Sequence, residues 1–215
     1  MAWHRHSIEP LHTATGRYYD TPLGRVPSVT TVLGRTAIRH EQDAWVRQVG
    51  ISEARRRTAE AVARGRAFHL EMQEHLQRGI PGTSAFFRSV QPFVARIDAI
   101  QLVEGTVWHR DGFAGTVDCV ASVNGVLSVI DWKTSSKKKP SDAVRDERLQ
   151  VAAYRHAVQA LYHVEVKQGF VVFALPDQQA HVLPLLDLDR LYEVFLQRLH
   201  AVPSQTTADP AALSD

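Results

Sequence analysis

The chain has 215 residues, 44% of them hydrophobic, which is enough to bury one substantial core in a single globular domain. Its formal net charge of +2 is too small to indicate a nucleic-acid partner by itself. The single cysteine, Cys119, excludes internal disulfides and four-cysteine zinc or iron–sulfur sites, and the lack of an apolar run of about 18 residues predicts a soluble protein without membrane contact.

The N-terminal third is predicted to contain an arm and several helices. Residues 1–27 mix aromatic residues with turn formers, which predicts an N-terminal arm or hairpin. Ser28 is a suitable N-cap for a short helix that begins at Val29. Helical periodicity then predicts helices at about 41–49, 52–78 and 85–100, where Gly79 ends the second and Pro92 could kink the third.

The middle of the chain changes to β-branched, alternating residues. Strands are predicted at 102–109, 115–123 and 126–132, and the last two are joined by Asn124-Gly125, a strong signal for a tight hairpin. A helix at 142–162, strands at 165–174 and 180–185, a helix at 188–200 and a disordered tail at 202–215 follow. This order predicts one α/β domain, 28–201, with a mixed central β-sheet flanked by helices on both faces.

The predicted hairpin places two acids opposite each other. If Val123 pairs with Val126, paired positions sum to 249, and Asp118 lies opposite Asp131, with Lys133 on the same face. Two carboxylates this close destabilise a buried sheet unless something compensates their charge. A divalent cation such as Mg²⁺ would do so, and Lys133 would then stabilise charge or orient water. The alternative is a structural ion pair between Lys133 and one acid.

The hairpin resembles a known nuclease core. The segment 112–135, with GTVD ending at Asp118 and DWKT beginning at Asp131, resembles the PD-(D/E)XK superfamily. Within it, the segment is similar to the RecB-like exonuclease branch, which includes phage and mitochondrial genome maintenance exonucleases. The resemblance implies a restriction-endonuclease-like core and one or two Mg²⁺ or Mn²⁺ ions, held by Asp118, Asp131 and the backbone carbonyl of Trp132, with Lys133 positioning water. Val117 replaces the proline of the family's name, and one cysteine excludes its iron–sulfur members.

Two further candidates for metal binding precede the hairpin. His69, in the GRAFH segment, recurs at helical spacing with Val62, Gly65, Met72 and Leu76. By pattern alone it is a core histidine, whereas the resemblance implies that it reaches the metal. The mid-helix glycine beside it predicts a close approach of backbone or ligand. Glu104 is a second candidate ligand, with an ordinary strand-edge glutamate as the alternative.

A pair of polar residues follows the hairpin on the long helix. Gln150 and Tyr154 lie four residues apart, and so share one helix face. Alone, this spacing fits a core tyrosine with a boundary glutamine. The pair resembles the Q-x-x-x-Y motif of RecB-type nucleases, which implies that it braces the site and contacts DNA.

The predicted partner is DNA, single-stranded or with free ends, as the resemblance implies. The candidate contacts are polar or basic residues near the proposed metal, although solvated faces are the common fate of such runs; they are Thr134, Lys137, Lys138, Lys139, Arg64 and Arg66. A non-catalytic nuclease-like DNA-binding module and a PD-(D/E)XK endonuclease remain alternatives to an exonuclease. The expected location is the cytoplasm of a bacterial or phage-infected cell, with the mitochondrial matrix as the alternative.

Overall fold

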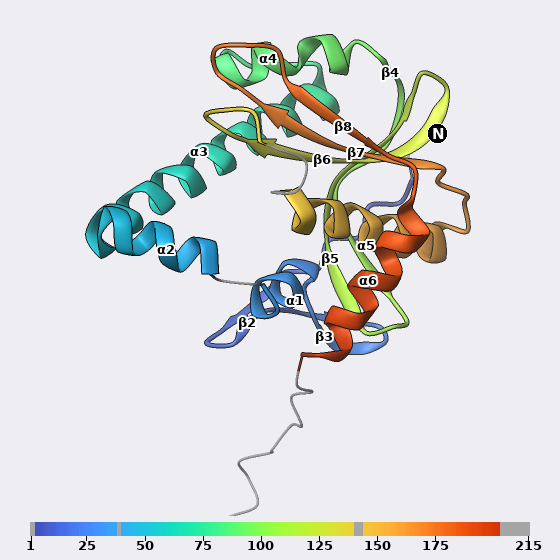
Figure 1. The fold of residues 1–215 in the computed structure, drawn as a ribbon. Helices are drawn as coiled ribbons and strands as arrows, with labels where there is room; N and C mark the ends of the chain where they lie inside the picture. Colours follow the sequence, from blue (N-terminus) through green and yellow to red (C-terminus); the bar gives the residue numbers. More distant parts are fainter. Residues whose placement is uncertain (1–2, 38–39, 140–143, 203–215) are drawn as a thin grey trace, which may run out of the picture.

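The computed structural model describes residues 3–37, 40–139 and 144–202, and these form two sheets and six helices (Figure 1). The smaller sheet is antiparallel, with strands β1 (Leu11–Thr13), β2 (Gly16–Thr21) and β3 (Gly24–Pro27). The larger sheet has the order β4-β5-β6-β7-β8, with β4 (Ile97–His109), β5 (Phe113–Val123), β6 (Val126–Thr134), β7 (Gln168–Ala174) and β8 (His181–Leu185). The helices are α1 (Val29–Arg35), α2 (His40–Val49), α3 (Ile51–Arg78), α4 (Ala85–Val94), α5 (Arg145–Tyr162) and α6 (Leu188–His200).

Helices cover both faces of the five-stranded sheet. Only β6 and β7 are parallel, and α5 provides the crossover that a parallel pair requires. Side chains alternate along β6, so Val129 lies in the core formed with α1, α5 and α6, whereas Ile130 lies in the core formed with α3 and α4. This arrangement confirms the predicted mixed α/β fold. No helix among the described residues is long and apolar enough to span a membrane.

The predicted helix at 85–100 was wrong in its second half. Helix α4 ends at Val94, and β4 begins at Ile97, five residues earlier than predicted. Two register irregularities, between Ile97 and Ala99 and between Ile100 and Leu102, interrupt the pairing of β4 with β5. They remove the period-two alternation that would have identified the strand.

The apolar stripe predicted on α3 holds only at its C-terminal end. Met72 is buried, but Val62 is 57% exposed, and Phe68 is the other large side chain that this helix buries. In Figure 1 the first half of α3 projects away from the sheet together with α2, and only its second half approaches β6. A long helix that packs along half its length cannot keep one continuous buried face.

The N-terminal segment lies against the larger sheet. Ser28 forms an isolated bridge with Ala114, and the Tyr19 hydroxyl lies 3.2 Å from the Thr116 hydroxyl. Both contacts are on β5, close to the hairpin residues of interest. Of the predicted tail, only Val202 lies within the described residues.

A partly buried histidine between α5 and α6 predicts a pH dependence of stability. His156 stacks on Tyr192 with ring centroids 3.7 Å apart, and Arg155 Nη1 lies 3.0 Å from its Nε2, where it donates. Burial and the neighbouring Arg155 lower the pKa of His156 from 6.5 to about 4. The folded protein therefore binds fewer protons than the unfolded chain between these values, and its free energy of unfolding falls as the pH drops through this window.

The expected loss between about pH 7.5 and about pH 5 is at most about 2 kcal/mol from this residue, because solvent at its partly exposed side chain screens the charges. Denaturant unfolding of the wild type and of His156→Phe, which keeps a ring against Tyr192 but does not titrate, measures it. The variant should lose less stability over the same interval. Equal losses in both proteins would show that His156 titrates normally.

Candidate active site

The β5–β6 hairpin has the predicted turn and register. Val123 pairs with Val126, and Asn124 and Gly125 both have positive φ, of 50° and 77°, as a two-residue turn of this type requires. The pairing continues to Cys119 and Ile130, one position before the two acids. There the Asp118 side chain joins the strands, because Oδ2 accepts a 2.8 Å hydrogen bond from the backbone N–H of Trp132. Asp118 is thus fixed beside the end of β6.

A second carboxylate lies opposite Asp118 on the other neighbouring strand. Val103 pairs with Cys119 and Gly105 with Val117, so Glu104 occupies the position across from Asp118, with a positive φ of 49°. The loop that joins β4 and β5 has three residues, 110–112, so counting from a two-residue turn at Asp111-Gly112 would place Glu104 opposite Cys119, one residue out of register. His109 pairs with Phe113, and the numbers of paired residues continue to add up to 222 along β4 and β5 as far as Glu104 and Asp118.

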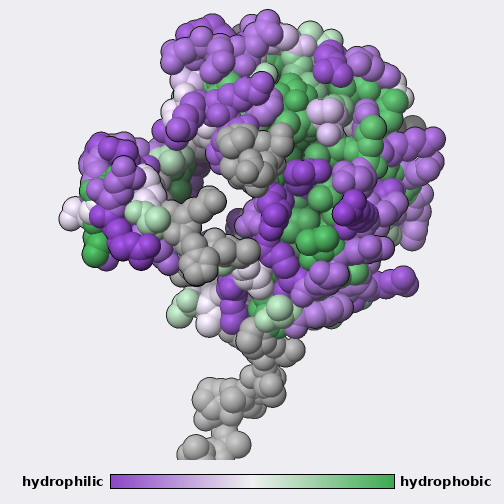
Figure 2. Space-filling model, in the orientation of Figure 1, coloured by the Kyte–Doolittle hydropathy of each residue, from purple (hydrophilic) through white to green (hydrophobic). Residues whose placement is uncertain are grey.

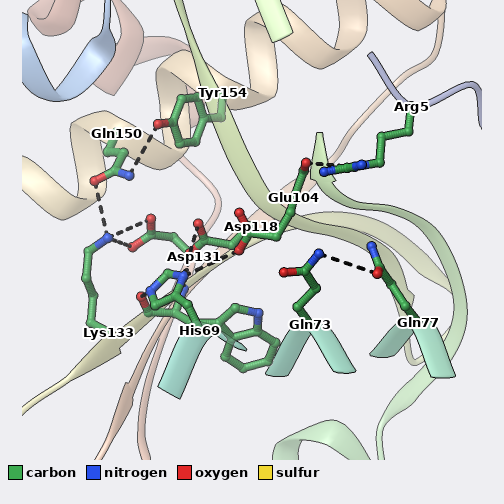
Figure 3. A network of polar contacts seen from close by, with 11 residues as sticks. Arg5, His69, Gln73, Gln77, Glu104, Asp118, Asp131, Lys133, Gln150 and Tyr154 are labelled. Atoms are coloured by element: carbon green, nitrogen blue, oxygen red, sulfur yellow. Dashed lines mark hydrogen bonds and ion pairs between the residues drawn. The ribbon is translucent and has the colours of Figure 1, made fainter. Parts of the chain in front are cut away.

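His69 completes this cluster from α3. Its Nε2 lies 2.9 Å from the Trp132 carbonyl oxygen, which can only accept, so Nε2 carries a hydrogen. The other nitrogen, Nδ1, faces the acids, 3.5 Å from Glu104 Oε1 and 3.7 Å from Asp118 Oδ1 (Figure 3). The ligand atoms of His69, Glu104 and Asp118 all lie within 4.8 Å of one another, and the described residues contain no second such group.

The charges of this cluster suit a bound cation. Burial raises the pKa of Asp118, and it raises that of Asp131 to about 7. Burial would lower the pKa of His69, but Asp118 and Glu104 outweigh it and raise the value to about 9. A proton on Nδ1 therefore compensates the two carboxylates in the metal-free protein. A divalent cation bound by the same three atoms would replace that proton, and the donor set fits one.

Lys133 links the cluster to α5. Its Nζ lies 2.8 Å from Oδ1 and 2.6 Å from Oδ2 of Asp131 and donates to Gln150 Oε1 at 3.3 Å. Gln150 Nε2 in turn donates to the Tyr154 hydroxyl at 3.5 Å. Burial opposes the charge of Lys133, but Asp131 and Asp118 outweigh it and raise its pKa, so Lys133 is an ammonium. It can donate hydrogen bonds and stabilise negative charge, but it cannot accept a proton from water.

Two predicted metal ligands are engaged elsewhere. Asp131 is ion-paired with Lys133 and does not belong to the three-donor cluster. The Trp132 carbonyl uses one of its two lone pairs for His69. Both remain predictions as ligands, since either oxygen would have to bind the cation in addition to its present partner.

The predicted DNA contacts lie in different environments. Lys137, Lys138 and Arg66 are exposed, while Thr134 is partly buried. Lys139 is paired with Glu147 at 3.2 Å, and Arg64 lies over the Phe86 ring at 5.8 Å. No backbone among the described residues approaches Gly65 closely, because a Cβ there would meet only Thr134 Oγ1, at 3.9 Å, while a close approach of a ligand stays a prediction.

A glycine that the sequence reading missed positions Tyr154. A Cβ at Gly115 would lie 2.7 Å from a Tyr154 ring carbon and 2.8 Å from its hydroxyl oxygen. Tyr154 is buried, so its ring cannot move aside. Gly115→Ala is expected to destabilise the protein by about 1–3 kcal/mol and to displace the Gln150–Tyr154 pair.

Hydrolysis and thermal melting of Gly115→Ala test this expectation. Gly34→Ala is the matched control, because a Cβ at Gly34 meets nothing within 4 Å. Gly115→Ala should lower both stability and rate, and Gly34→Ala neither. Wild-type behaviour of Gly115→Ala would show that Tyr154 has room to shift.

Comparison with known proteins agrees with this geometry. The chain is 34% identical to mitochondrial genome maintenance exonuclease 1 of Mus musculus over 191 residues, covering 79% of this chain and 56% of the relative. The Xenopus tropicalis protein of the same name is 31% identical, and the match covers 77% of this chain and 53% of the relative. The Homo sapiens protein is 32% identical, and the match covers 73% of this chain and 52% of the relative. The chain thus spans about half the length of these relatives.

The fold comparison is more distant, and the family match is broad. The crystal structure of SSO0001 superposes with a TM-score of 0.38 at 18% identity over 82% of this chain and 76% of that one, too remote to add to the argument. The sequence profile of the PD-(D/E)XK nuclease superfamily matches residues 11–210. Together with the relatives, this match confirms the resemblance: the chain belongs to the PD-(D/E)XK nuclease superfamily.

Proposed function

We propose that the protein is a divalent-metal-dependent DNA exonuclease. The observation that carries this proposal is the juxtaposition of three metal-ligand atoms, from His69, Glu104 and Asp118, with the Lys133–Asp131 pair at the end of β6. The site lies where the hairpin strands, α3 and α5 meet, and the names of the relatives, which are exonucleases, agree with it.

Some of these side chains would bind the metal, and the others would contact the substrate or the attacking water. Glu104 and Asp118 would supply oxygen ligands and His69 a nitrogen ligand, and a cation bound there would stabilise the charge that develops on the phosphate. The Trp132 carbonyl orients His69 by accepting from Nε2. Lys133 would donate to the attacking water or a phosphate oxygen, and Gln150 and Tyr154 would keep its ammonium in place.

The donor set favours Mn²⁺ over Mg²⁺. Mg²⁺ is a hard ion that prefers oxygen ligands, whereas Mn²⁺, a first-row transition ion, accepts an imidazole nitrogen more readily. We expect hydrolysis to reach half-maximal rate at a lower concentration of Mn²⁺ than of Mg²⁺. His69→Gln, which offers an oxygen in place of the nitrogen, should reduce the difference.

Metal titrations of the hydrolysis rate for both proteins provide the measurement. Exposed His12→Gln on β1 serves as the control substitution. If the ratio of the half-maximal Mn²⁺ and Mg²⁺ concentrations is the same in His69→Gln as in the wild type, the imidazole does not bind the cation.

The proposed substrate is DNA that is single-stranded or has free ends. Figure 2 shows an opening between the arm formed by α2 and α3 and the rest of the molecule, and α3 and α5, which carry His69 and Gln150, border it in Figure 1. End-labelled single- and double-stranded DNA, free or blocked at the 5′ or 3′ end, should be degraded only where an end is free.

Two rival functions give different results in the same assay. An endonuclease would cleave covalently closed circular DNA, and a non-catalytic module would bind DNA without cleaving any substrate at any metal concentration. For location, we propose the cytoplasm of a bacterial or phage-infected cell, with the mitochondrial matrix, which the name of the relatives suggests, as the alternative.

A further inference from the structure

We propose that a pocket beside the metal cluster binds one nucleotide of the substrate strand, adjacent to the phosphate that is cleaved. The proposal rests on the nuclease function above and adds a subsite to it. The pocket has a volume of about 290 Å³ and lies between the N-terminal segment, the end of α3 and the start of β4. Residues lining it include Trp3, Arg5, Leu76, Gln77, Leu102 and Val103.

The pocket adjoins the cluster through Glu104. Arg5 lines the pocket, and its Nε donates a 2.9 Å hydrogen bond to the backbone carbonyl of Glu104, whose side chain is one of the three metal-ligand groups. Figure 3 shows Arg5 and Gln77 on one side of this cluster, and Lys133 and Gln150 on the other. A strand whose phosphate reaches the cluster could therefore place its neighbouring nucleotide in the pocket.

One face of α3 forms a continuous polar track into the pocket. His69, Gln73 and Gln77 are spaced four residues apart, so they lie on the same face of the helix. Gln73 Nε2 donates to Gln77 Oε1 at 3.4 Å, and only Gln77 lines the pocket. The track thus offers amide donors and acceptors next to the metal ligand on the same helix.

The chemistry of the lining matches a nucleotide. Leucine and valine side chains form an apolar surface with the Trp3 indole, while Arg5, Gln77 and Gln101 supply donors and acceptors. None of the lining residues is acidic, so the Arg5 guanidinium can contact a phosphate without a competing carboxylate in the pocket. The volume lies at the lower end of the about 300–1,000 Å³ of small-molecule sites, which suits one base with its sugar.

The aromatic wall is held in position before any ligand arrives. The backbone N–H of Trp3 donates to the Gln101 carbonyl at 3.0 Å, and its ring stacks on Tyr162 with centroids 4.5 Å apart. The Tyr162 hydroxyl donates to the His4 carbonyl at 2.9 Å. These contacts fix the N-terminal segment against β4 and α5. Binding of a ligand therefore carries no free-energy cost for ordering this wall of the pocket.

A comparison of base-bearing and abasic strands tests the subsite. Affinities are measured by fluorescence anisotropy for an oligothymidylate and for a fully abasic strand of the same length, in EDTA so that no bond is cleaved. Trp3→Ala should weaken binding of the oligothymidylate about tenfold and leave the abasic strand within about twofold, because base–aromatic contacts need a base. Arg5→Gln should weaken the binding of both strands alike. It should also make the slope of log affinity against log salt concentration shallower by about one.

Two exposed positions keep the test independent of folding. Arg5 and Gln77 are exposed, so Arg5→Gln and Gln77→Glu should fold normally, and Gln77→Glu should weaken both strands by placing a carboxylate in the pocket. Arg25→Gln on β3 and Gln197→Glu on α6 are the matched controls and should bind as the wild type does.

The outcomes separate this proposal from the proposed function. The subsite is contradicted if Trp3→Ala weakens both strands equally, if Arg5→Gln and Gln77→Glu bind as the wild type does, or if the wild type binds no oligothymidylate. If Trp3→Ala shows the predicted base-dependent loss but the wild type hydrolyses no DNA with Mn²⁺, the pocket still binds a nucleotide and the nuclease assignment is overturned.

Discussion

Asp118→Asn is expected to reduce DNA hydrolysis by about a thousandfold while preserving the fold. Asparagine keeps an oxygen that can accept from the Trp132 N–H, as Asp118 Oδ2 does at 2.8 Å. It removes the negative charge that faces His69 and lies opposite Glu104. The metal would then lose one of its two anionic ligands, while the strand junction stays intact.

Thermal melting adds a readout that does not depend on turnover. A cation that binds only the folded protein raises the melting temperature, so Mn²⁺ should stabilise the wild type and have little effect on Asp118→Asn. Asp20→Asn is the matched control, because Asp20 is exposed and pairs with Arg25 on the small sheet. Hydrolysis by Asp118→Asn within about tenfold of the wild-type rate would contradict the assignment of Asp118.

Lys133→Met is expected to lower hydrolysis by about a hundredfold or more and to destabilise the protein by about 3 kcal/mol. Methionine has a similar length but no charge, so the fully buried side chain of Asp131 loses its ion-pair partner. The rate falls because no ammonium remains to stabilise charge on the phosphate. Metal binding should persist, since Lys133 is not among the three donor residues.

Combining Lys133→Met with Asp131→Asn separates the two effects. The double variant no longer buries an unpaired carboxylate and should recover most of the lost stability, measured by denaturant unfolding, but not the lost activity. For stability alone, Lys139→Met is the control, because its pair with Glu147 is more exposed and should contribute at most about 1 kcal/mol. Full activity in the double variant would show that Lys133 serves structure alone.

The sequence predicted the hairpin half of the site because a tight turn fixes register. Asn124-Gly125 sets the β5–β6 pairing, and period-two alternation then places Asp118 beside Asp131 with no further information. The same reasoning applied to Asp111-Gly112 fails by one residue, because the β4–β5 loop has three residues, 110–112, and the observed register pairs His109 with Phe113. Counting therefore places residues near a turn only when the number of residues in the turn is known.

Other features depend on contacts that no local pattern contains. The two irregularities in β4 hid the start of the strand, and a helix was predicted across it. The orientation of the His69 ring is set by the Trp132 carbonyl, 63 residues away in the chain. Gly115 faces Tyr154 only because α5 packs on the sheet, so its role follows from tertiary packing.

Anomalous diffraction at the manganese edge, from crystals grown with Mn²⁺, tests the proposed metal site most directly. We predict an anomalous peak within coordination distance of His69 Nδ1 and of carboxylate oxygens of Glu104 and Asp118. No peak at this cluster at saturating Mn²⁺, or a peak elsewhere with His69 still bridging the acids, would contradict it.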